Sequence, residues 1–170
     1  MTILKNKQVV PVVMLFLLSA CAGNGNEQPS SKLPVLLVYS SAHCGVTSRE
    51  PVLSVITSQQ QLSNNVAKAG MMAGQPLPVG DISFNKDMLL LVNMGQKPTG
   101  GYGFKLVDGK SSYQQAWAHV QLEWKSPAKG MMLTQALTSP CVMLSIPRQA
   151  YAGIRVFDQS GAARLETLLK

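Results

Sequence analysis

Residues 118–125 alternate strictly between apolar and polar side chains, and this alternation constrains the fold more than any other stretch of the chain. The apolar set is Ala118, Val120, Leu122 and Trp124, and the polar set is His119, Gln121, Glu123 and Lys125. Successive side chains of a strand point to opposite faces, so the pattern predicts a strand with one buried and one exposed face. Such a strand requires a sheet that is covered on one side.

Other short apolar runs separated by turn residues predict the remaining strands. They are residues 35–39, 52–56, 88–94, 102–106, 131–135, 141–146, 154–157 and 164–168. The run at 88–94 is apolar enough for a central strand, and Asp108-Gly109 is typical of a hairpin turn. The expected fold is therefore mainly β: a β-sandwich or open barrel of about eight short strands.

One short helical insertion is expected near residues 58–69. Thr57 or Ser58 can cap its start, and a glutamine three residues later can complete a capping box. Leu62, Val66 and Ala69 then fall at helical spacing, which would give the helix one apolar face.

The first residues have the layout of a cleavable lipoprotein signal peptide. Lys5 and Lys7 precede an apolar stretch at 9–18 that is too short to span a bilayer, and small residues then lead to Cys21. The sequence Leu-Ser-Ala-Cys at 18–21 resembles the bacterial lipobox. The cysteine of that motif is acylated with chains such as palmitate and becomes the mature N-terminus. The resemblance implies removal of residues 1–20 and a bilayer anchor on Cys21.

The rest of the chain is expected to be one domain on a tether. Residues 21–32 are small and polar, which predicts a flexible tether, and residues 33–170 would form a single β domain. In lipoproteins that are sorted by the residue after the acylated cysteine, an alanine such as Ala22 resembles the signal for the outer membrane. We therefore expect a bacterial cell-envelope protein, lipid-anchored at the outer membrane and facing the periplasm.

Cys44 and Cys141 are the two cysteines that remain after the lipid acceptor. In an oxidising envelope compartment, an even pair predicts a disulfide. Two buried free thiols are the alternative, because the sequence alone does not show that the residues are close in space.

The remaining composition excludes several classes of protein. The formal net charge is +7, but the basic residues are scattered singly, so no nucleic-acid partner is predicted. No nucleophile, metal or dinucleotide motif occurs. His119 falls on the polar face of its strand, and His43 adjoins Cys44 without a second ligand at metal-binding spacing. We therefore predict a non-enzyme with no catalytic residue, metal, cofactor or small-molecule substrate.

A tight loop is expected after the 88–94 strand. Pro98 fixes one φ angle, while Gly100 and Gly101 allow positive φ. Loops on a rigid scaffold commonly carry recognition. The predicted partner-binding loop comprises Lys97, Pro98, Thr99, Gly100, Gly101 and Tyr102.

The Pro-Thr-Gly-Gly-Tyr sequence at 98–102, preceded by an apolar strand and followed by Gln-Ala-Leu-Thr-Ser-Pro at 135–140, resembles the PrcB family of envelope proteins. The resemblance covers about residues 52–157. That family is named for a subunit of a surface protease complex. The resemblance implies a β-rich accessory domain, often found in lipoproteins, that helps to assemble or stabilise a partner protease without catalytic residues of its own.

The same loop is more weakly similar to chagasin-type protease inhibitors, which insert an Asn-Pro-Thr-Thr-Gly-Tyr-like loop into a protease cleft. Here Lys97 replaces the asparagine and Gly100 the second threonine. The leading hypothesis is a non-catalytic envelope lipoprotein whose domain binds or stabilises a partner protein such as a protease. The alternatives are a direct protease inhibitor and a purely structural envelope lipoprotein, whose loop only closes a hairpin.

Overall fold

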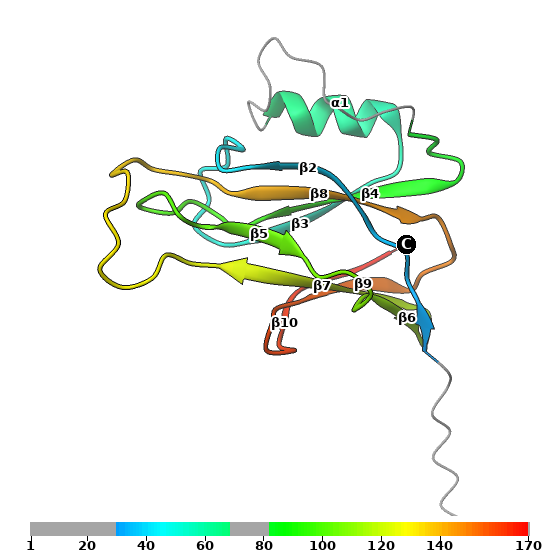
Figure 1. Ribbon diagram of the computed structural model, residues 1–170. Coiled ribbons are helices and arrows are strands. Elements are labelled where there is room, and N and C mark those ends of the chain that lie inside the picture. Colours follow the sequence, from blue (N-terminus) through cyan, green and yellow to red (C-terminus); the bar gives the residue numbers. More distant parts are fainter. Residues whose placement is uncertain (1–29, 69–81, 170) are drawn as a thin grey trace, which may run out of the picture.

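The computed structural model describes residues 30–68 and 82–169, which form ten strands and one helix (Figure 1). In chain order they are β1 (Ser31–Lys32), β2 (Leu36–Ser41), β3 (Val52–Ile56), α1 (Gln59–Lys68), β4 (Asp87–Asn93), β5 (Gly103–Leu106), β6 (Ser112–Gln114), β7 (Trp117–Lys125), β8 (Cys141–Pro147), β9 (Gly153–Phe157) and β10 (Ala163–Leu168). Most of the predicted strands are confirmed, and the fold is mainly β.

The strands form two stacked sheets, so the architecture is an open β-sandwich. One sheet has the order β2-β8-β4-β3, with every pair antiparallel. The other has the order β1-β6-β7-β9-β10, and β5 also pairs with β7. In this second sheet β7 and β9 run parallel. Helix α1 covers the outer face of the first sheet (Figure 1).

The central strand β4 is buried on both faces, which explains its unbroken apolar sequence. Leu90 and Val92 face the other sheet and share a core with the apolar side of β7. Leu89 and Leu91 point the other way and pack beneath α1. A strand between two layers has no polar face, so the expectation of a central strand is confirmed.

Helix α1 begins at the predicted cap. The Ser58 hydroxyl accepts a hydrogen bond from the amide of Gln61 (3.2 Å), and the Gln61 side chain accepts one from the amide of Thr57 (2.8 Å). Two of the free amides at this end are thereby bonded. Leu62 is buried against the first sheet and Val66 packs beside it. Ala69 lies outside the described residues.

A disulfide joins Cys44 to Cys141 with 6.0 Å between their Cα atoms, as the sequence predicts. It links the segment after β2 to the first residue of β8, and both cysteines are buried beneath the helix layer. The bridge closes a separation of 97 residues. In the loop-entropy model such a closure stabilises the fold by about 4–5 kcal/mol.

The predicted hairpin turn at Asp108-Gly109 is wrong. Strands β5 and β6 do not pair with each other, because both pair with β7 and so form one side of a longer hairpin. Gly109, at φ 69°, lies in the bend between them. The connection between the arms is Gln115-Ala116, whose φ angles are 50° and 63°. Two successive positive φ angles match the twist of paired strands. The sequence lacks the glycine or asparagine that normally indicates such a turn.

The predicted strand at 131–135 is also wrong, because this segment lies within the connection between β7 and β8. It joins neither sheet. Its apolar residues Met131 and Met132 are exposed rather than paired in a ladder.

The N-terminal predictions concern residues that the structure does not describe. The signal peptide at 1–20 and the lipid acceptor Cys21 lie outside the described residues. Within them, strand pairing begins at Ser31, two residues before the expected domain start. In the described ranges, no helix has the length and apolar character needed to cross a membrane.

Candidate functional site

The loop at 95–102 connects β4 to β5 at one end of the sandwich, where it is clamped to the segment leading into β8. Lys97 and Thr138 exchange two backbone hydrogen bonds, of 2.8 and 2.9 Å. The amide of Gly100 donates to the carbonyl oxygen of Thr134 at 3.1 Å. The two segments that the sequence singled out, 98–102 and 135–140, therefore lie side by side.

Two threonine hydroxyls strengthen this clamp. The hydroxyl of Thr138 donates to the carbonyl oxygen of Thr99 at 2.8 Å, and the hydroxyl of Thr99 donates to the carbonyl of Gly100 at 3.1 Å. Every one of these bonds uses at least one backbone group. The loop is thus ordered by its own chain, which is consistent with the tight loop that the sequence predicts.

The glycines that adopt positive φ in this loop are Gly95 and Gly101 rather than Gly100 and Gly101. Gly101 has a φ of 85°, as expected, but Gly100 does not adopt positive φ. The other left-handed residue is Gly95, with φ 77°. An added Cβ at Gly95 would lie 2.6 Å from the carbonyl carbon of Arg49 and nearer still to its oxygen. A close approach between two backbones is invisible in a single sequence, so sequence reasoning missed this residue.

Of the predicted loop residues, Pro98 and Gly101 are exposed and the others are half-buried. Tyr102 packs against the core between the sheets, and the Lys97 ammonium lies 5.9 Å from the centre of its ring. The loop therefore presents Pro98 and the charged end of Lys97 to solvent, and it uses Tyr102 partly as a structural side chain.

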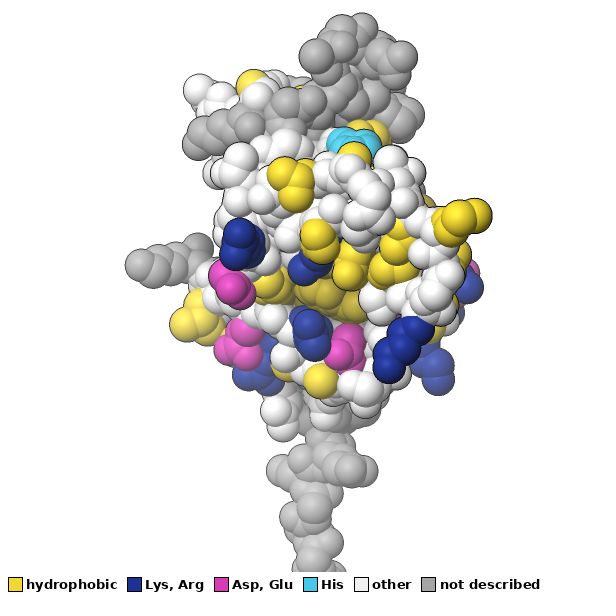
Figure 2. Space-filling model, turned by 90° about the vertical axis from the view of Figure 1, so that its left-hand side faces the viewer, with side chains coloured by type: hydrophobic (Ala, Val, Ile, Leu, Met, Phe, Trp, Pro, Cys, Tyr) yellow, Lys and Arg dark blue, Asp and Glu magenta, His cyan; other side chains and the backbone are white. Residues whose placement is uncertain are grey.

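Beside the loop lies a hollow of about 250 Å³. Lys97 and Tyr102 form its near wall, Trp124 and Lys125 at the end of β7 form another, and Arg164 comes from β10. Figure 2 shows hydrophobic side chains gathered in the middle of this end of the sandwich, with Lys, Arg and acidic side chains around them. Sequence reasoning did not find the hollow, because its walls come from four distant segments.

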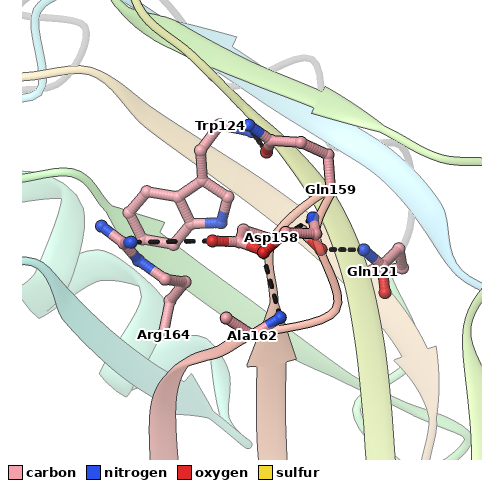
Figure 3. A network of polar contacts seen from close by, with 7 residues as sticks. Gln121, Trp124, Asp158, Gln159, Ala162 and Arg164 are labelled. Carbon is pink, nitrogen blue, oxygen red and sulfur yellow. Dashed lines mark hydrogen bonds and ion pairs between the residues drawn. The ribbon is translucent and has the colours of Figure 1, made fainter.

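A network around Asp158 fixes the far wall of the hollow (Figure 3). One carboxylate oxygen accepts hydrogen bonds from the Ser160 hydroxyl (2.6 Å), the Ser160 amide (2.9 Å) and the Ala162 amide (3.1 Å). The Ser160 hydroxyl contributes most to holding the pKa of Asp158 below its usual value. The Gln121 side-chain amide donates to the Asp158 carbonyl, so the network ties the β9–β10 turn to β7.

Arg164 links this network to the aromatic part of the hollow. Its guanidinium nitrogen lies 3.6 Å from the second carboxylate oxygen of Asp158, and the guanidinium carbon lies 5.2 Å from the centre of the Trp124 ring (Figure 3). The lining thus carries three cations against one carboxylate, which is already bonded. The net field at the hollow is positive.

The segment after β7 adds exposed apolar surface to this end. Met132 is fully exposed, Leu137 is 64% exposed and Met131 is 58% exposed. Leu137 directly precedes Thr138 of the clamp. Sequence reasoning placed Met131 and Met132 in a strand and so missed their exposure.

The two histidines contribute no reactive cluster. The ring of His119 is half-buried and packs edge-on against Phe157, with 5.2 Å between ring centres. Burial, and secondarily Arg155, lowers its pKa. His43 is exposed, precedes Cys44 of the disulfide, and forms an isolated parallel β-bridge with Ser139 through its backbone. Over residues 30–68 and 82–169, no three His, Cys, Asp or Glu side chains group as a metal site.

The fold and this end of it define a β-sandwich with a preformed loop and a cationic, aromatic hollow. Residues 88–147 match the family model described as PrcB C-terminal, which confirms the resemblance to the PrcB family over that stretch. The match runs from β4 to β8, so it contains the loop and the segment that clamps it. No curated protein and no solved structure matches the chain. The family is that of a protease-complex subunit rather than a catalytic family.

Proposed function

We propose that the protein is a non-catalytic, lipid-anchored envelope protein whose PrcB-like domain binds a partner protein, and that the partner is a protease. One observation carries the proposal: a clamped loop and three exposed apolar side chains share one end of the sandwich. The match to a protease-complex family over the same segments supports the choice of partner.

The exposed apolar side chains are the part of this end that folding does not explain. Exposed apolar residues that cluster beside a polar rim commonly mark a protein–protein contact. Methionine is also well suited to such a surface, because its unbranched side chain adapts to different partners. Met131, Met132 and Leu137 all lie in one connection, next to a loop whose backbone is already ordered.

The proposal is tested by cross-linking the full-length lipidated protein in membranes and identifying the cross-linked proteins by mass spectrometry. A variant with Met131→Ser, Met132→Ser and Leu137→Ser should lose its cross-linked protease while keeping its melting temperature. The matched control is Leu36→Ser with Leu37→Ser, since both side chains are also exposed but lie on β2. The control should retain the partner. Equal retention by both variants would overturn the proposal.

The lipid anchor has a separate test on Cys21. Labelling growing cells with a radioactive fatty acid should mark the wild-type protein and leave Cys21→Ala unlabelled. Full labelling of the variant would exclude the anchor and leave the partner-binding proposal untouched.

A further inference from the structure

We propose that the hollow beside the loop is an anchor site for an acidic segment of the partner, taking one aromatic side chain flanked by carboxylates. The inference rests on the proposed function and names the chemistry of the contact. The walls of the hollow include Lys97, Tyr102, Trp124, Lys125 and Arg164, which are described above, and also Met94, which follows β4.

The size of the hollow suits a single side chain rather than a whole ligand. At about 250 Å³ it is smaller than pockets that enclose drug-sized molecules, which measure roughly 300–1,000 Å³. A cavity of about 150 Å³ is enough for a benzene ring. One Phe or Tyr side chain therefore fits, with room for the atoms that attach it to its chain.

The lining combines charged and polar groups with one apolar and two aromatic side chains that an entering ring could contact. The Met94 side chain at the end of β4 is buried, and Tyr102 and Trp124 form half-buried aromatic walls. An entering ring would contact the Tyr102 and Trp124 side chains, and aromatic pairs of this kind are favourable. Anchors of this kind, seated in desolvated pockets, usually dominate the binding energy of an interface.

The charges around the hollow determine the rest of the partner segment. Lys97, Lys125 and Arg164 contribute three positive charges at the walls. The carboxylate of Asp158 is occupied by the turn amides and by Arg164. Among the described residues Lys97 and Lys125 form no ion pair, so carboxylates on either side of the anchor would meet these two cations, whereas a basic segment would be repelled.

The site is also rigid before anything binds. Two hydrogen bonds fix the far wall of the hollow to β7. The Gln121 side-chain amide donates to the Asp158 carbonyl oxygen. The Trp124 backbone amide donates to the Gln159 side-chain oxygen at 3.0 Å. The loop on the opposite side is held by the clamp. A preformed pocket loses little conformational entropy on binding, so a small contact can suffice.

The test is a titration of the ¹⁵N-labelled domain with a synthetic peptide, acetyl-Gly-Asp-Phe-Asp-Glu-Gly-amide, followed by NMR. Trp124 lines the site, while Trp117 lies against Arg155 on another part of the sheet. The Trp124 indole signal should shift with peptide concentration and the Trp117 signal should not. Replacing Phe by Ala in the peptide, or its three acids by Lys, should weaken binding at least about tenfold.

Protein variants provide the second arm. Lys125→Glu should weaken binding of the acidic peptide about tenfold, and the effect should shrink as salt rises. Lys86→Glu is the matched control, because Lys86 is also exposed but precedes β4 at its other end. An unmoved Trp124 signal, or equal binding by the two variants, would overturn the anchor site. If the membrane cross-linking partner is still captured in that case, the proposed function stands without it.

Discussion

Gly95 gives the sharpest test of how the candidate loop is built. A methyl group there would meet the Arg49 carbonyl and lie 2.9 Å from the Glu50 carbonyl oxygen, and both of these are backbone groups that cannot rotate away. Its φ of 77° adds strain for any residue with a Cβ. We expect about 1–2 kcal/mol from the left-handed backbone and a further 1–3 kcal/mol, roughly, from the displaced segment. Gly95→Ala should therefore lower the free energy of unfolding by about 2–5 kcal/mol.

Gly100→Ala is the matched control, five residues along the same loop. Gly100 lacks positive φ, and its added Cβ would lie 3.8 Å from the nearest heavy atom, the Cβ of Thr134. Its free energy of unfolding should stay within about 1 kcal/mol of wild type. Urea unfolding with the disulfide intact measures both, and Gly95→Ala should lower the midpoint by about 1–2 M. If the two substitutions destabilised the domain equally, the geometry assigned to Gly95 would be wrong.

Three further predictions concern the rest of the domain. Replacing Cys44 and Cys141 together by alanine should lower the free energy of unfolding by about 4–5 kcal/mol in urea, and a loss below about 1 kcal/mol would contradict the loop-entropy argument. The folded pKa of His119 lies below its ordinary 6.5, so the unfolded state takes up the proton first and stability should fall as the pH drops below 6.5. His119→Gln should flatten that fall. Ala116→Gly should raise the free energy of unfolding by about 0.5–1 kcal/mol by relieving a φ of 63°, and a lower urea midpoint would refute strain at this turn.

The sequence predicted the elements whose signals are local. The alternation at 118–125 gave β7, with Ala118, Val120 and Leu122 fully buried as expected. The cap at Ser58 gave the start of α1. Each of these signals depends on one strand face or one helix turn, so nothing distant is needed to read it.

The failures of sequence reasoning involve contacts between distant segments. Asp108-Gly109 has the residues of a hairpin turn, but β7 is long enough to pair with both β5 and β6. The hairpin turn therefore lies at Gln115-Ala116, between β6 and β7. The segment at 131–135 has the composition of a strand but joins neither sheet. Pairing partners decide such cases, and a single sequence does not name them.

Only the loop of the candidate site could be predicted from the sequence, because its signal is local, whereas the hollow depends on contacts between distant segments. The loop was found from its proline and glycines, which report backbone geometry directly. The hollow was not found, because Tyr102 of the loop, Trp124 of β7 and Arg164 of β10 are brought together only by the folded sandwich. The clamp lies between these cases: both of its segments were noticed, but their contact was not foreseen.

The clamp also bears on whether the loop only closes a hairpin. A connection between two strands needs a turn, and the backbone bonds from Lys97 and Gly100 to the segment at 134–138 already secure that turn. They do not require Met132 to be fully exposed, nor three cations around an aromatic hollow. A purely structural end would be more stable and more soluble with polar residues at the exposed apolar positions. The combination of a rigid loop with adaptable methionines beside it therefore favours recognition over closure, since the rigid part limits the entropy lost on binding and the adaptable part improves the fit.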